Sequence, residues 1–144
     1  MAEKNISQAK TPFITDIQEL RRRAREHIMR GAVTQDYQGD LDVAVKLLNE
    51  ALATEIVCVL RYKSHFYLAD GIHAKAVAEE FAEHATEEQQ HAEMISERIK
   101  QLDGEPNWSP EGILSRSHAE FKNGDTLAEL IKEDLIAERI AIES

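Results

Sequence analysis

Residues 77–102 carry possible metal ligands inside a helical pattern. The segment has no Gly or Pro and is rich in strong helix formers, so it predicts a helix. Polar groups in the middle of a buried helical stripe are costly unless they are paired. Glu88 and His91 have the E-x-x-H spacing with which helix bundles hold iron or manganese. The side chains that share this face, at intervals of three, four or seven residues, are Val77, Phe81, His84, Glu88, His91, Ile95 and Leu102.

Two more segments place an acid in an apolar helical stripe. Residues 40–69 predict a long helix whose stripe is Leu41, Val45, Leu48, Leu52, Glu55, Val59, Tyr62 and Phe66. A last helix is expected from residue 127, with one face formed by Leu127, Ile131, Leu135, Glu138 and Ile142. Asp134 lies one turn before Glu138, on nearly the same side.

The acids Glu55, Glu88 and Glu138 are therefore expected at matched depth in one helical core. Three facing carboxylates repel and raise one another's pKa unless a cation lies between them. Carboxylate oxygens with one imidazole suit iron or manganese better than zinc, whose structural sites favour Cys and His. The alternative is that these acids are solvated and hold no ion.

Composition limits the class of protein. The 144 residues contain few Gly and Pro and show helical spacing of apolar residues, which predicts one all-α domain with a core. The net charge of -10 argues against general nucleic-acid binding. The single cysteine, Cys58, excludes a C-x-x-C site. No apolar run approaches a membrane span and no signal peptide is recognised, so we expect a cytoplasmic protein.

The bundle is expected to occupy residues 40–144, after an N-terminal region of residues 1–39 that holds a tail, a short basic helix and a connector. The short helix is predicted over residues 14–30, with Thr15 or Asp16 as its N-cap. Its arginines form either a docking surface for an acidic partner or a solvated face. Residues 103–122 form a long connection, in which Trp108 is expected to be a packing anchor.

Three stretches resemble the helices of bacterioferritin. They are L-N-E-A-L-A-T-E-I-V-C-V-L-R-Y, then E-E-Q-Q-H-A-E-M-I-S-E-R-I-K-Q-L-D-G-E-P-N, and finally E-L-I-K-E-D-L-I-A-E-R. Over residues 40–144 the chain is similar to the ferritin-like di-iron carboxylate superfamily, in its bacterioferritin and rubrerythrin branch. The resemblance implies a ferritin-like antiparallel bundle of three long helices, preceded by the short N-terminal one.

The resemblance also implies roles for single residues. Glu55 would be a terminal iron ligand, Glu88 a bridging carboxylate and His91 an imidazole ligand, while Glu138 would supply the carboxylate of the last helix. Tyr62 would act near the iron pair as a hydrogen-bond or electron donor, unless it is ordinary core packing.

The remaining polar residues of these helices are expected to support the ligands. His84 either supports a ligand or is a hydrogen-bonded core histidine, and Asp134 is expected to orient His91. Bacterioferritin has a haem-ligating Met directly after the bridging Glu, where this chain has Gln89, so haem is not expected.

The family also has a fourth helix with a second E-x-x-H, and this chain has the motif once. An open apolar side should find a partner. We expect a homodimer or larger homo-oligomer, with or without exchanged helices, that presents two such motifs across its axis. The alternative is that the bundle is incomplete at the C-terminus, with the fourth helix lost.

These observations predict a di-iron protein that binds Fe(II) and oxidises it with dioxygen or peroxide, although manganese or zinc could occupy the site. One alternative is a rubrerythrin-type peroxide reductase that uses a separate electron donor. The other is a non-enzymatic helical interaction protein with an empty or structural metal site.

Overall fold

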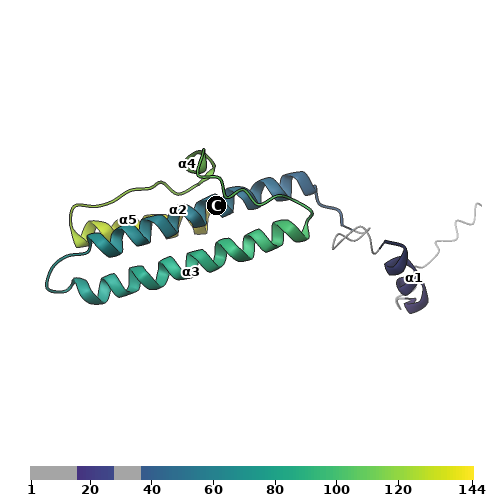
Figure 1. Cartoon of the computed structure of the whole chain (residues 1–144), viewed down its shortest axis with the longest axis horizontal. Coiled ribbons are helices and arrows are strands. Elements are labelled where there is room, and N and C mark those ends of the chain that lie inside the picture. The colour runs from purple at the N-terminus through teal and green to yellow at the C-terminus, as the bar shows by residue number, and fades with distance from the viewer. Residues whose placement is uncertain (1–15, 28–36) are drawn as a thin grey trace, which may run out of the picture. The chain divides into compact units, whose positions relative to one another are not determined.

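The computed structural model describes residues 16–27 and 37–144. Their regular structure is entirely helical, in the order α1 (Ile17–His27), α2 (Leu41–Leu68), α3 (Ala74–Gln101), α4 (Ile113–Arg116) and α5 (Leu127–Glu143) (Figure 1). The predicted all-α class and the long helices are therefore confirmed. The chain falls into two units, one holding α1 and the other holding α2 to α5.

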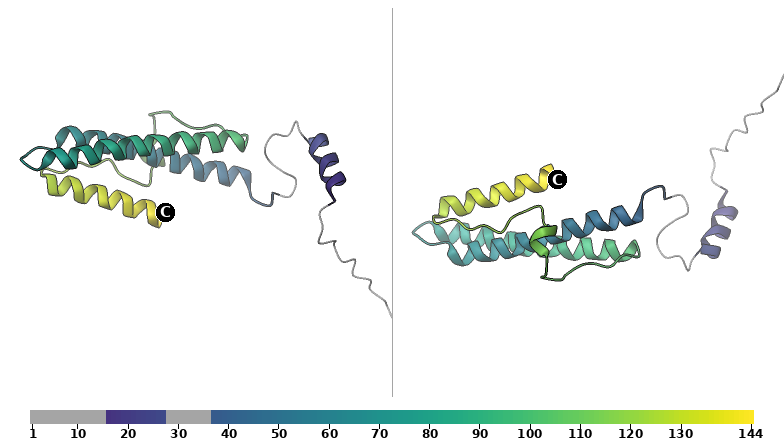
Figure 2. Two further views of the ribbon diagram at one scale, coloured as in Figure 1. Left: turned by 90° about the horizontal axis from the view of Figure 1, so that it is seen from below. Right: turned by 90° about the horizontal axis from the view of Figure 1, so that it is seen from above.

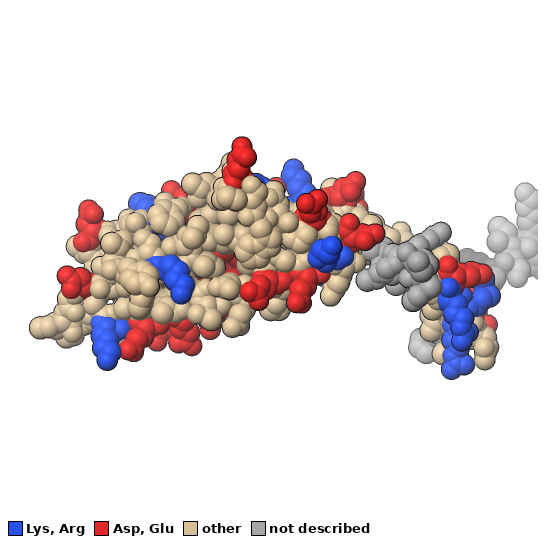
Figure 3. Space-filling view, in the orientation of Figure 1, with Lys and Arg blue, Asp and Glu red and all other residues tan. Residues whose placement is uncertain are grey.

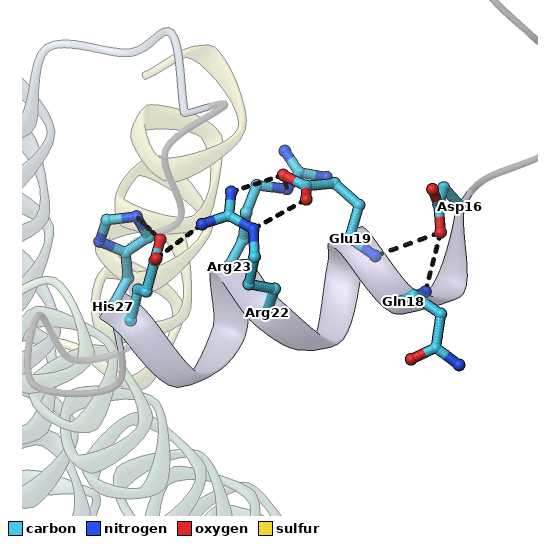
Figure 4. Close-up of polar contacts among 7 residues, drawn as sticks. Asp16, Gln18, Glu19, Arg22, Arg23 and His27 are labelled. Atoms are coloured by element: carbon cyan, nitrogen blue, oxygen red, sulfur yellow. Dashed lines mark hydrogen bonds and ion pairs between the residues drawn. The ribbon is translucent and has the colours of Figure 1, made fainter.

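Helix α1 is stabilised by contacts within its own unit (Figure 4). Asp16 caps it by accepting hydrogen bonds from the backbone N–H groups of Gln18 and Glu19, at 2.9 and 3.2 Å. Arg22 pairs with Glu19 and Glu26 at 2.7 and 2.6 Å. Basic side chains gather on this helix (Figure 3), and none of its residues is buried. Thr15, the predicted tail and residues 28–30 lie outside the described residues.

Helices α2 and α3 form an antiparallel hairpin (Figures 1 and 2). Asp40 caps α2 by accepting from the N–H groups of Asp42 and Val43, at 3.0 and 3.1 Å. The turn between the two helices contains Gly71, whose φ of +114° favours glycine. The small side chains Ala85 and Ala92 of α3 are fully buried, which is consistent with a close approach of the two helices.

The core consists of two apolar clusters. One lies around Val57, Cys58, Tyr62 and Phe81, with Leu130 of α5 packed into it. The other is formed by Leu52, Ala92 and Ile99. Between the two clusters, α2 carries Glu55 and α3 carries Glu88. The core therefore supports the two acids from both sides.

The long connection between α3 and α5 crosses from one end of the hairpin to the other, as its length predicts (Figure 1). It can begin close to α2 because Gly104 has no side chain, and a Cβ there would lie 2.8 Å from both methyl carbons of Val45. Asn49 holds the same segment by hydrogen bonds to the Glu105 carbonyl and the Asn107 N–H. Trp108, the expected packing anchor, is about half exposed and donates to the Ser96 hydroxyl of α3 at 2.9 Å.

Helix α5 begins with a capping box in which Thr126 and Glu129 each bond the other's backbone N–H.

The face that α5 buries is not the predicted one. Leu130, Glu133, Asp134 and Ala137 are buried, whereas the predicted core residues Ile131, Leu135 and Ile142 are 37%, 65% and 81% exposed. The helix has apolar residues on two faces, and periodicity does not decide which of them packs.

Among the residues that the structure describes, no helix is long and apolar enough to cross a membrane. The charged side chains of the bundle are mainly acidic on the face seen in Figure 3.

The core assignment can be tested with a matched pair of leucines on α2. Leu52 is fully buried and Leu47 is 57% exposed. We expect Leu52→Ala to lower the free energy of unfolding by about 2–5 kcal/mol, because it removes buried methyl groups and leaves a cavity. Leu47→Ala should cost less than about 1 kcal/mol. Urea unfolding of metal-free protein measures both, and equal losses would contradict this core.

Candidate metal centre

The structure brings together three of the predicted ligands, Glu55 from α2 and Glu88 and His91 from α3. One ligand atom from each of them lies within 4.8 Å of the other two. His91 Nδ1 lies 3.0 Å from Glu88 Oε2 and 3.5 Å from Glu55 Oε2. The E-x-x-H spacing places the carboxylate and the imidazole on one side of α3, and the hairpin brings Glu55 opposite them.

The three side chains differ in their exposure to solvent. The side chains of Glu88, Glu55 and His91 are 13%, 21% and 55% exposed. The carboxylates therefore lie at the edge of the core and the imidazole lies at the surface. His91 is thus the most exposed of the three groups.

The electrostatics of the site disfavour two ionised carboxylates. The pKa of Glu55 is raised to about 9, first by burial, then by its hydrogen bond with Glu88 and by the negative charges of Glu88 and Glu138. Without a cation, Glu55 is therefore expected to keep its proton at neutral pH. A divalent cation at this position would replace that proton and remove the repulsion.

Glu138 faces the same region from α5. Its carboxylate accepts a short hydrogen bond from the hydroxyl of Tyr62, which is almost completely buried. The pKa of Tyr62 is raised, mainly by burial and then by the hydrogen bond to Glu138. Glu138 is not part of the group of three ligands, but its charge acts on Glu55.

The two predicted supporting residues have other contacts. The His84 ring stacks on Tyr62 with centroids 5.1 Å apart, and its Nδ1 lies 3.9 Å from Glu87. Asp134 hydrogen-bonds His65 at 2.8 Å and does not contact His91 among the described residues. The expected orienting role of Asp134 toward His91 is therefore wrong, because this side of α5 faces α2.

Sequence reasoning missed a polar cluster that joins α2 to α5. It contains Arg61, His65, Glu133 and Asp134, all buried. The signal in the sequence is a basic residue and a histidine four positions apart on α2, next to a buried stripe. Neighbouring Cys58 is buried too, and burial with the charge of Glu88 raises the pKa of its thiol to about 12.

The raised pKa of Glu55 predicts a pH dependence of stability in metal-free protein. Folded Glu55 holds its proton to about pH 9, whereas the ordinary pKa is 4.5. The folded state therefore binds more protons between these values, and the free energy of unfolding falls as pH rises through them. Glu55→Gln removes this dependence. The free energy of unfolding of the variant, relative to that of wild type, should therefore increase as the pH rises from about 5 to about 8. Urea titrations measure the difference. The control is Glu97→Gln, an exposed acid on α3, and parallel curves for wild type and Glu55→Gln would contradict the assignment.

Comparison with known proteins agrees with this geometry. Residues 45–144 match the family model of the ferritin-like domain. The bacterioferritin of Mycobacterium leprae is 36% identical over 101 residues, which is 70% of this chain and 58% of that protein. The bacterioferritin of Mycobacterium avium is 35% identical over the same shares of the two chains. The chain thus spans 58% of the length of these relatives.

Two solved structures have the same architecture. The dodecameric thioferritin of Bacteroides fragilis, a bacterioferritin-related protein, has a TM-score of 0.68 at 28% identity, covering 72% of this chain and 62% of that one. The Dps protein of Thermosynechococcus elongatus has a TM-score of 0.67 at 25% identity, covering 72% and 67%. The family match over residues 45–144, the bacterioferritin relatives and the helical bundle together show that the chain belongs to the ferritin-like family.

Proposed function

We propose that this protein handles iron by binding Fe(II) at Glu55, Glu88 and His91 and oxidising it with dioxygen or peroxide. The observation that carries this proposal is the convergence of these three side chains at a position where burial and neighbouring carboxylates raise the pKa of Glu55. The relatives named bacterioferritin support iron as the metal.

The donor set fits iron chemically. Two carboxylates and one imidazole form an oxygen-rich site, which suits iron or manganese. Carboxylate ligands stabilise Fe(III) relative to Fe(II), so such a site favours loss of an electron to an oxidant. The exposed side of His91 is the direction from which oxidant and metal would reach the site.

Binding requires this chain to release a proton. Glu55 holds its proton at neutral pH, and a carboxylate must be ionised to act as a ligand. His91 must likewise offer a lone pair on its coordinating nitrogen. Affinity should therefore rise with pH between about pH 6 and pH 8.

Tyr62 and Glu138 would complete the site from its buried side. The Tyr62 hydroxyl donates to Glu138, which sets the direction of that carboxylate. A tyrosine at this position can also give an electron to the oxidant, with Glu138 as the proton acceptor. We therefore propose Tyr62 as an electron donor to this site.

A second copy of the chain would supply the remaining ligands. Two-metal bundles use an E-x-x-H pair from each of two helices, and this sequence contains the motif once. The exposed apolar residues of α5, Ile131, Leu135 and Ile142, form a face that a second copy can cover. We propose a homo-oligomer whose contacts include this face and which brings two copies of Glu88 and His91 together. The dodecameric relative supports assembly of this kind of chain.

Iron binding and oxidation can be tested with three variants. We expect Glu88→Ala and His91→Ala to abolish iron binding and Fe(II) oxidation, because each removes one of few ligands. Glu87→Ala, at an exposed neighbouring acid, should keep both. Elemental analysis, Fe(II) consumption and thermal unfolding with and without metal measure these effects. Unchanged metal content in Glu88→Ala or His91→Ala would overturn the proposed site.

The oxidant assay also separates the alternatives. Stoichiometric loss of Fe(II) with dioxygen supports ferroxidase chemistry. Catalytic consumption of peroxide with an added electron donor would instead indicate a rubrerythrin-type reductase. Protein that binds no metal in any assembly state would support the non-enzymatic interaction protein.

Assembly can be tested at Leu135. We expect Leu135→Glu to lower the mass of the assembly measured by sedimentation, since it places a charge in the proposed contact. The number of iron ions bound per chain should fall as well. Wild type should hold about one iron per chain if two chains share one two-metal site. Ile72→Glu, at a 94% exposed residue in the α2–α3 turn, is the control and should leave the assembly intact. Unchanged assembly of Leu135→Glu would exclude this face.

A further inference from the structure

A buried charged cluster lies outside the metal centre, where α5 meets α2. His65 and Arg61 of α2 are 0% and 1% exposed, and Asp134 of α5 is buried against them. Buried charges are costly unless they are paired and hydrogen-bonded, so the arrangement of their partners defines the charge of each group.

Both ring nitrogens of His65 face acceptors. Nε2 lies 2.9 Å from the carbonyl oxygen of Lys122, and a carbonyl can only accept. Nδ1 lies 2.8 Å from both carboxylate oxygens of Asp134. An ionised carboxylate also only accepts, so His65 must carry two protons if Asp134 is ionised.

Arg61 decides between this state and a neutral His65 beside a protonated Asp134. Its Nη2 lies 3.8 Å from Asp134 Oδ1, and a guanidinium keeps its charge in proteins. Oδ1 is buried, and the Arg61 guanidinium and the His65 ring both lie close to it, so the charge of Arg61 helps to offset the burial of the carboxylate. A permanent positive charge beside Asp134 favours the carboxylate and therefore places the proton on His65.

We propose that His65 is a doubly protonated imidazolium and that Arg61, His65 and Asp134 form a charged clamp that holds α5 on α2 and so positions Glu138. The last step rests on the proposed function, in which Glu138 acts at the metal centre. Asp134 and Glu138 are one turn apart on α5, so fixing the first sets the place of the second relative to Tyr62.

The clamp also holds the connection that precedes α5. Arg61 donates through Nη1 to the Glu120 carbonyl at 2.8 Å and through Nη2 to the Glu133 carbonyl. His65 holds the Lys122 carbonyl. Two residues of α2 therefore hold both the end of the connection and the middle of α5.

Two further sets of neighbours, the Lys122–Glu133 pair and Phe81, add no net charge to this cluster. Lys122 points its ammonium to Glu133, 3.1 Å away, so this pair is neutral as a whole. From α3, Phe81 presents its ring to the imidazole at a centroid distance of 5.7 Å. Asp134 is thus shared by the two cations Arg61 and His65.

The charge of His65 can be measured directly on metal-free, full-length protein. We expect nitrogen-15 NMR of ring-labelled protein at pH 7.5 to show both nitrogens of His65 protonated. Asp134→Asn should convert His65 to a neutral ring, because an amide cannot balance an imidazolium. Glu143→Gln removes an exposed acid from the same helix and should leave His65 charged. A singly protonated His65 in wild type would overturn the proposal.

The positioning role needs a second readout. Hydrogen exchange of the α5 amides in metal-free Asp134→Asn should be faster by about a hundredfold, while α2 amides keep their protection. Asp134→Asn should also weaken iron binding, and Glu143→Gln should not. Unchanged α5 protection or unchanged iron affinity in Asp134→Asn would overturn the clamp's positioning role. Wild type that binds no iron but shows a charged His65 would instead refute the proposed function and leave the clamp intact.

Discussion

The repulsion between half-buried carboxylates is the constraint on which the rest of this structure depends. Glu55 and Glu88 lie between two apolar clusters of the α2–α3 hairpin, where ionisation of both is costly. The hairpin packing holds the helix segments that carry these acids next to each other. A proton now offsets this repulsion, and a divalent cation would offset it more completely. Stability, proton release and metal affinity are therefore coupled through one pair of side chains.

Helix α5 is attached in a different way from the hairpin. Its buried face includes two acids, Glu133 and Asp134, so polar contacts contribute much of its attachment to α2. Hydrogen bonds and ion pairs have stricter geometry than apolar contacts and define the position of a helix more narrowly. This explains how a helix with few buried apolar residues can still present Glu138 to the Tyr62 hydroxyl.

The opposite face of α5 is apolar and exposed, whereas the face against α2 is polar and buried. Ile131, Leu135 and Ile142 are apolar and exposed, although their spacing is that of a buried stripe. We propose that this stripe is a contact surface between copies of the chain. The same helix thus has a polar side that holds it to its own chain and an apolar side suited to another copy. Completion of the metal centre and assembly would be one event in this arrangement.

Local sequence was sufficient to predict the helices and the common face of Glu88 and His91. Capping residues such as Asp40 and Thr126, the Gly-containing turns and the E-x-x-H spacing act within a few residues, so the elements and the shared face of Glu88 and His91 could be predicted. Only the tertiary structure decided which face of α5 is buried and that Asp134 meets His65 instead of His91. These outcomes depend on contacts between residues 59 to 72 positions apart, about which helical periodicity carries no information.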